Sequence, residues 1–138
     1  GQPVRPLVNV ASGGELSRIM LAIKAVMAER DDIETLIFDE IDVGISGRTA
    51  QKVSEKMALI GKKHQVICIT HLAQIAAMAD AHYAIEKCVE NGKTKTNISL
   101  LNSEQEIDEL ARILGGAEIT DIVKRSAFEM KELAKATK

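Results

Sequence analysis

Two adjacent acidic residues, Asp39 and Glu40, follow the apolar segment Thr35–Phe38, which predicts a buried β-strand. In open parallel sheets, ligands bind beyond the carboxyl ends of the strands. Two carboxylates at such a position suit phosphoryl chemistry, because one can hold Mg²⁺, directly or through water, while the other polarises an attacking water. The alternative is that the two acids only mark a solvated turn after the strand.

A histidine, His71, follows a second apolar segment, Gln65–Thr70, which also predicts a strand. The carboxyl ends of parallel strands meet at one edge of a sheet, so we expect His71 at the same edge as Asp39 and Glu40. An imidazole there can reach a terminal phosphate or the attacking water, whereas a lone histidine more commonly has a structural role.

The segment Ser12–Glu15 (SGGE) has the spacing of a capping box at the start of a helix. Capping alone does not account for Gly13 and Gly14, because a glycine in a helix costs up to about 1 kcal/mol relative to alanine. Without Cβ atoms, an anion can approach the free N–H groups at the positive end of the helix. We therefore predict that Ser12, Gly13 and Gly14 form a phosphate-binding helix start.

The elements that must position these residues alternate between helices and strands. Three helices are expected in this part of the chain: from Gly13 to about Arg30, from near Ser46, and from Leu72 to Ala79. In the second of these helices, Val53, Met57 and Ile60 are predicted to face inward. The two strands have no alternating polar face, and each is followed by a helix. This pattern indicates an α/β fold with βαβ units and a parallel sheet covered on both sides.

The character of the sequence changes after His82. Segments 84–86 and 94–101 flank Asn91-Gly92, which is a strong hairpin signal. A helix is expected next, with a capping box from Ser103 to Glu106 and an end at Gly115-Gly116. Its predicted inward residues are Ile107, Leu110, Ala111 and Leu114.

The last helix is expected from about Glu118 to Ala134. Its basic residues alternate with acidic ones, which favours a solvated face over a nucleic-acid surface. These residues are Lys124, Arg125, Glu129, Lys131, Glu132 and Lys135.

The composition is that of a soluble globular domain, with 138 residues, 46% hydrophobic and 28% charged. A formal net charge of −2 and 2% aromatic residues argue against a dedicated basic nucleic-acid surface and against stacking platforms for single strands. Cys68 and Cys88 are interpreted as small buried hydrophobes in a reducing compartment. We expect a cytoplasmic protein, because the longest segment without charged residues, 65–79, is too short to span a bilayer.

The sequence contains no G-x-x-x-x-G-K-[ST] phosphate loop. Gly92-Lys93-Thr94 has the right ending, but Lys87 stands where the first glycine is required, and Asn91-Gly92 predicts a turn. By its own residues, the chain is therefore not expected to build a whole nucleotide site.

Three motifs, in this order, resemble the second half of an ABC-type ATPase head. Ala11–Glu15 resembles the ABC signature motif, Leu36–Glu40 resembles a Walker B strand, and His71 resembles the switch histidine. Longer segments resemble the RecN family of bacterial DNA repair proteins, relatives of the SMC proteins. These segments are Ala11–Lys24, Leu36–Gly47, Cys68–Asp80 and Glu109–Gly116.

The resemblance implies that residues 1–138 form the C-terminal lobe of an ABC-type head, with residues 1–6 left from the connector to a coiled coil. The Walker A motif would lie on a separate N-terminal lobe, without which the fragment is expected to be inactive. Two heads of a homodimer would enclose ATP and Mg²⁺ between them. The family further implies recombinational repair of DNA double-strand breaks, with DNA as a partner, in the bacterial nucleoid. The alternatives are a head lobe of another SMC-type ATPase and a non-catalytic interaction module.

The resemblance also implies a role for each matching residue. Asp39 would assist Mg²⁺, Glu40 would be the general base, and His71 would contact the γ-phosphate of ATP on its own head. Ser12, Gly13 and Gly14 would reach the γ-phosphate held by the opposing head. The D-loop would consist of Asp42, Val43, Gly44, Ile45 and Ser46, where the chain departs from the common S-A-L-D tetrad.

Overall fold

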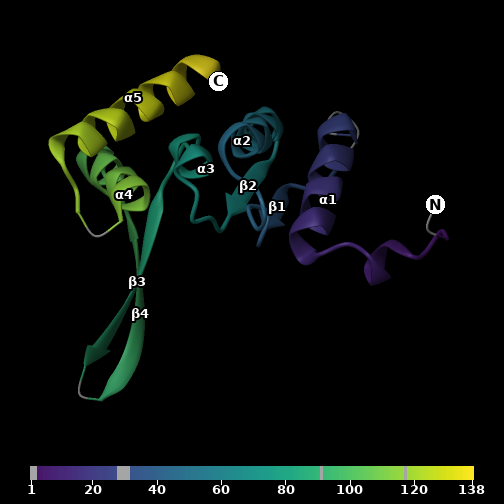
Figure 1. The fold of residues 1–138 in the computed structure, drawn as a ribbon, viewed down its shortest axis with the longest axis horizontal. Coiled ribbons are helices and arrows are strands. Elements are labelled where there is room, and N and C mark those ends of the chain that lie inside the picture. The colour runs from purple at the N-terminus through teal and green to yellow at the C-terminus, as the bar shows by residue number, and fades with distance from the viewer. Residues whose placement is uncertain (1–2, 28–31, 91, 117) are drawn as a thin grey trace. The chain divides into compact units, whose positions relative to one another are not determined.

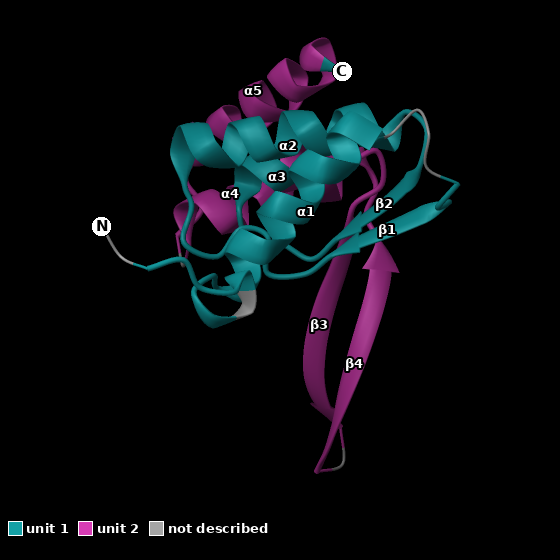
Figure 2. Cartoon of the chain, turned by 90° about the vertical axis from the view of Figure 1, so that its right-hand side faces the viewer, with its two compact units in different colours: residues 1–75, 138 teal, residues 76–137 magenta. Residues whose placement is uncertain are grey.

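The computed structural model describes residues 3–27, 32–90, 92–116 and 118–138 (Figure 1). The chain divides into two compact units, residues 1–75 with residue 138, and residues 76–137 (Figure 2). The first unit contains the 3₁₀ helix η1 (Leu7–Asn9), α1 (Gly13–Met27), β1 (Thr35–Phe38), α2 (Gly47–Gly61) and β2 (Gln65–Cys68). The short helix α3 (Ala73–Ala77) crosses the boundary between the units.

Strands β1 and β2 are parallel, and Thr35 to Phe38 pair with Gln65 to Cys68 in register. The two strands and α2 between them form the predicted βαβ unit. β2 ends at Cys68, two residues earlier than expected, so His71 lies in the loop that follows the strand. The parallel sheet and the mixed helix and strand content are thus confirmed.

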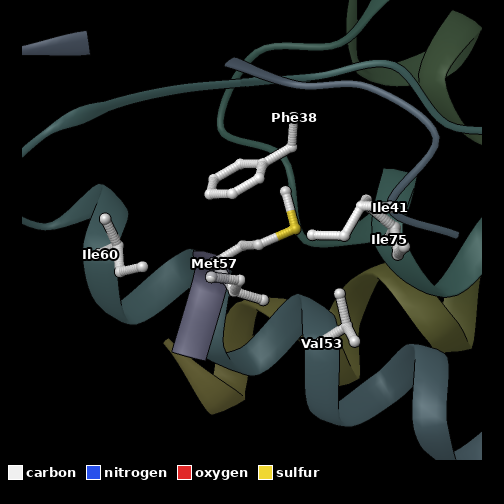
Figure 3. Packing of buried hydrophobic residues seen from close by; sticks show 7 residues of the cluster. Phe38, Ile41, Val53, Met57, Ile60 and Ile75 are labelled. Atoms are coloured by element: carbon white, nitrogen blue, oxygen red, sulfur yellow. The ribbon is translucent and has the colours of Figure 1, made fainter. Parts of the chain in front are cut away.

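The core of the first unit lies between α2, α1 and one face of the sheet. Figure 3 shows the Met57 side chain reaching from α2 toward Phe38 and Ile41. The buried cluster consists of Leu21, Phe38, Ile41, Val53, Met57, Ile60 and Ile75. Val53, Met57 and Ile60 are therefore inward, as their helical spacing predicts.

The opposite face of the sheet is exposed, which differs from the expectation of a sheet covered on both sides. Ile37 is 68% exposed and its register partner Ile67 is 44% exposed. Most large apolar side chains of α1 are also exposed, and Leu21 is the buried hydrophobic residue of this helix. The exposed residues of α1 are Leu16, Ile19, Met20, Ile23, Val26 and Met27. Exposed apolar faces of this kind indicate surfaces that contact other chain segments or proteins.

The second unit begins with a two-stranded antiparallel hairpin. β3 (Tyr83–Glu90) pairs with β4 (Lys93–Leu100), from Tyr83 opposite Leu100 to Glu90 opposite Lys93. The predicted hairpin is confirmed, and Gly92 has the positive φ of 73° that its turn favours. Asn91, the other residue of the predicted turn, lies outside the described residues.

Two helices complete the second unit, α4 (Ser103–Gly115) and α5 (Asp121–Thr137), and they pack against each other. The predicted capping box of α4 is wrong by one residue. The Asn102 side chain accepts from Gln105 N and the Gln105 side chain accepts from Asn102 N, at 2.9 Å each. Asparagine caps as well as serine does, so the helix takes the pair that starts one residue earlier than Ser103 and Glu106.

Three further expectations about these helices are corrected. Helix α5 starts at Asp121 rather than near Glu118, because the Thr120 main-chain and hydroxyl oxygens accept from Lys124 N and Val123 N. Leu110 and Ala111 are buried as predicted, but Leu114 is 39% exposed. Lys131 does not belong to a solvated face: it is 6% exposed and pairs with Glu106 at 3.1 Å.

The two cysteines lie in strands, as expected, and both are free, but they are half-buried rather than buried. Among the helices that the structure describes, none has the length and apolar character needed to cross a membrane.

Candidate functional site

The loop that follows β1 carries Asp39 and Glu40 at the carboxyl end of the strand. Glu40 adopts a left-handed conformation with φ 57°, and it is the one non-glycine residue with positive φ among those the structure describes. Such a conformation costs about 1–3 kcal/mol in a non-glycine residue and persists only where surrounding contacts enforce it. The Asp39 carboxylate supplies one such contact, because its Oδ1 accepts from Glu40 N at 2.9 Å.

Helix α1 holds the same loop through two side chains. The Ser17 hydroxyl donates to the main-chain oxygen of Asp39 at 3.1 Å. Arg18 Nη1 donates to the main-chain oxygens of Ile41 and Val43, at 2.9 Å each. Because the Ile41 side chain is completely buried, the loop is fixed on one side by packing and on the other by Arg18.

The two glycines at the start of α1 lie against this loop. A Cβ at Gly13 would stand 2.9 Å from Glu40 Oε2. A Cβ at Gly14 would stand 2.8 Å from the main-chain oxygen of Glu40 and 3.2 Å from that of Val43. At Gly14 the absence of a Cβ therefore permits a close approach of helix and loop, a reason for this glycine that sequence reasoning missed, whereas at Gly13 the nearby atom belongs to the flexible Glu40 side chain.

Ser12 forms the predicted capping box with Glu15. Its hydroxyl accepts from Glu15 N at 3.3 Å, while Ser12 N and Oγ both donate to Glu15 Oε2 at 2.8 Å. The hydrogen bond from the Ser12 main chain, followed by that from its hydroxyl, holds the pKa of Glu15 below its usual value. The start of α1 is thus capped by Ser12 and Glu15, and the Glu15 carboxylate is ionised.

Asp42 connects the loop after β1 to the end of β2. Its side chain is 3% exposed, and one oxygen, Oδ2, meets Thr70 Oγ1 at 2.7 Å, His71 N at 2.9 Å and His71 Nδ1 at 3.0 Å. Burial alone would raise the pKa of Asp42, but the hydrogen bonds from Thr70 and His71 outweigh it, and the pKa is lowered. A negative charge is therefore held beside the ring of His71, whose side chain is 72% exposed.

Cys68, the last residue of β2, lies near the acidic loop. Burial, followed by the charges of Asp42 and Asp39, raises the pKa of this thiol to about 12. The thiol is consequently protonated at neutral pH and is not a nucleophile. Among the described residues, no group of three or more His, Cys, Asp or Glu side chains could hold a metal ion by itself.

The structure therefore brings most of the predicted site residues to one loop system. Gly13 and Gly14 approach Glu40 directly, Asp39 bonds to Glu40, and His71 is tied to the same loop through Asp42. Val43, Gly44 and Ser46 are exposed, whereas Asp42 is turned inward. Sequence reasoning missed Ser17, Arg18 and Thr70. Two positions in the sequence could have indicated these residues. Arg18 lies one helical turn after Gly14, and Thr70 directly precedes His71.

Comparison with known proteins gives a consistent result. DNA repair protein RecN of Bacillus subtilis is 46% identical over 138 residues, which is 100% of this chain and 24% of that protein. RecN of Vibrio cholerae is 47% identical over 130 residues, 94% of this chain and 24% of that protein. RecN of Treponema pallidum is 51% identical over 116 residues, 84% of this chain and 20% of that protein.

The chain belongs to the RecN family. It spans about a quarter of the length of the curated RecN proteins that it matches. No protein-family model matches the chain.

Proposed function

We propose that this chain supplies part of the ATPase head of a RecN-type DNA repair protein, acting in recombinational repair of double-strand breaks. The arrangement around Glu40 carries the proposal. Its left-handed backbone is held between α1 and the carboxyl ends of two parallel strands, and strain of this kind is concentrated at functional sites. The repair role rests on the DNA repair proteins named above.

In this proposal Glu40 is the general base for the water that attacks the γ-phosphate of ATP. Asp39 holds Mg²⁺, directly or through water, and the ion when bound neutralises charge that develops on the phosphates. A single carboxylate fits this ion, because Mg²⁺ is usually bound by one or two carboxylates together with substrate phosphates and waters. His71 contacts the γ-phosphate from the loop after β2.

The helix start at Ser12, Gly13 and Gly14 reaches the γ-phosphate of ATP held by a second head. Gly13 and Gly14 lie in the first turn of α1, and the positive end of a helix favours an anion. The D-loop contacts the same second head in a homodimer, and the exposure of Val43, Gly44 and Ser46 supports this part of the proposal.

The exposed apolar surfaces of the first unit support docking of a Walker A lobe. Ile37 and Ile67 lie on a sheet face that parallel sheets normally bury. The exposed stripe of α1 adds Ile19, Ile23 and Met27. Covering such surfaces stabilises a complex by about 25 cal/mol for each Å² of apolar area removed from water.

The proposal is tested by measuring Mg·ATP hydrolysis by this chain alone and after addition of a separately produced RecN lobe that carries the phosphate loop. We expect no turnover by the chain alone and turnover on mixing. The variant Glu40→Gln should bind ATP normally and stall turnover, and Glu34→Gln, an exposed acid before β1, is the matched control. Unchanged turnover in Glu40→Gln would exclude Glu40 as the base. If the two lobes associate but do not hydrolyse ATP, the result would favour a non-catalytic interaction module.

A further inference from the structure

The Asp42 carboxylate lies at the junction of the two loops of the candidate site. Its Oδ2 receives the Thr70 hydroxyl, the main-chain N–H of His71 and the ring Nδ1 of His71. The Thr70 hydroxyl is itself oriented, because its oxygen accepts from Leu72 N at 3.0 Å and its proton is left for Asp42. The donors around this oxygen are thus fixed in direction by the main chain after β2.

This geometry determines which nitrogen of His71 is free. An ionised carboxylate only accepts hydrogen bonds, so Nδ1 at 3.0 Å from Asp42 must carry a proton. Nε2 lies on the other side of the ring, and the side chain is 72% exposed. Nε2 is therefore the atom that His71 presents, as an acceptor when the ring is neutral and as a donor when it is charged.

We propose that Asp42 is a positioning residue for His71, which holds Nδ1–H and turns Nε2 toward the γ-phosphate and the attacking water. The inference rests on the proposed ATPase function of the site. Asp42 is two residues after Glu40, and Val43 N donates to the Glu40 main-chain oxygen at 3.1 Å. The same short loop therefore sets the positions of the general base and of the histidine relative to each other.

The experiment uses a RecN-type protein that contains this chain, and it compares Asp42→Ala, His71→Gln and the double variant. If Asp42 acts through His71, each single change lowers kcat by about tenfold or more, with ATP binding little altered. The double variant should then be no slower than His71→Gln, because the two residues act as a unit. An equal loss from Asp42→Ala in the wild-type and His71→Gln backgrounds would overturn the proposal, since a purely structural role predicts that result.

A milder variant covers the case in which Asp42→Ala does not fold. Asp42→Asn keeps an acceptor oxygen for the Thr70 hydroxyl and the His71 main chain, but it removes the charge that strengthens the bond to Nδ1. We expect kcat to fall by about threefold or more and to remain above that of Asp42→Ala. Asp32→Asn, at an exposed position before β1, is the matched control and should behave as the wild type. Turnover of Asp42→Asn equal to that of the control would overturn the proposal.

A spectroscopic test separates this inference from the proposed function. In protein labelled with ¹³C in its histidine rings, the His71 signal is identified by its loss in His71→Gln. At about pH 8.5, where a free imidazole is neutral, the ring should show the Nδ1–H tautomer, and Asp42→Ala should shift it toward Nε2–H. An Nε2–H ring in the wild type would overturn the positioning role at any level of activity. The expected tautomer together with wild-type turnover in His71→Gln would instead overturn the ATPase role of His71, and with it this inference.

Discussion

Gly14 in α1 packs so closely against Glu40 that a Cβ at position 14 would lie 2.8 Å from the Glu40 main-chain oxygen. The start of the helix is therefore closely packed against the left-handed residue after β1. In the proposed ATPase head, Gly14 belongs to the site shared with a second head, and Glu40 belongs to the site of its own head. In that proposed head, the contact of Gly14 with Glu40 would join the two sites.

Replacing Gly14 by alanine should separate helix and loop. The added methyl group meets main-chain oxygens of Glu40 and Val43, which cannot rotate away, so we expect a loss of about 1–3 kcal/mol in the free energy of unfolding. Chemical denaturation measures this loss. Gly61→Ala is the matched control, because nothing lies within 4 Å of its added Cβ, at the end of α2. That control should be neutral or stabilising by up to about 1 kcal/mol. Equal stability of the two variants would contradict the close approach.

Arg18 should be the main polar support of the loop after β1. Arg18→Ala removes both hydrogen bonds to the Ile41 and Val43 carbonyls, at an expected cost of about 1–3 kcal/mol in the free energy of unfolding. Arg18→Lys should lower the free energy of unfolding by less than Arg18→Ala, because a lysine ammonium retains the positive charge. Some loss should remain, since the ammonium lacks the geometry of the guanidinium. Limited proteolysis at the loop measures its local opening. If both variants resist cleavage as well as Arg48→Ala, an exposed arginine of α2, then Arg18 does not hold the loop.

Local patterns in the sequence predicted the elements but not their detailed contacts. The strand at Thr35–Phe38, the inward face of α2 and the hairpin around Gly92 depend on neighbouring residues alone, and all three are confirmed. The capping box of α4 shows the limit of such patterns. Asn102 with Gln105 and Ser103 with Glu106 both satisfy the spacing, and only the path of the chain into the helix selects the first pair.

The candidate site depended more strongly on tertiary structure. The motif residues Asp39, Glu40 and Gly13 were found from their types and spacing. The inward orientation of the Asp42 side chain was not predicted, because it depends on contacts with Thr70 and His71, which follow β2. The burial of Lys131 was likewise missed, since interleaved charges along α5 do not reveal which side faces α4. Charge patterning reports the composition of a helix face, and packing decides its environment.

The ion pair between Lys131 and Glu106 should contribute strongly to the second unit. Lys131 Nζ lies 3.1 Å from Glu106 Oε2 and donates to the Ala79 main-chain oxygen at 3.0 Å, with the side chains 7% and 14% exposed. Lys131→Ala leaves a carboxylate and a carbonyl without their partner, so we expect a loss of about 3 kcal/mol in the free energy of unfolding. Lys135→Ala breaks an exposed pair with Glu132 and should leave the unfolding midpoint nearly unchanged. Similar midpoints for the two variants would show that the buried pair contributes no more than a surface pair.

His82 should make the stability of the protein fall as the pH is lowered from about 7.5 to 5.5. Burial lowers the pKa of His82, and this effect outweighs the charges of Glu109 and Glu106, which act in the opposite direction. Its Nδ1 is buried and has no hydrogen-bond partner. In the unfolded chain the imidazole has its ordinary pKa and takes up a proton in this window, while the folded chain resists protonation, so acidification favours unfolding through this residue.

The variant His82→Gln removes the titrating group and should flatten this part of the pH profile. The change attributable to one such histidine is at most about 1.4 kcal/mol for each pH unit. Asp42, Glu15 and Glu109 have lowered pKa values, so their contributions are lost only under more acidic conditions and do not enter this window. Chemical denaturation of both proteins at pH values across the window measures the difference. Parallel profiles for the wild type and His82→Gln would mean that His82 is protonated equally in the folded and unfolded chains.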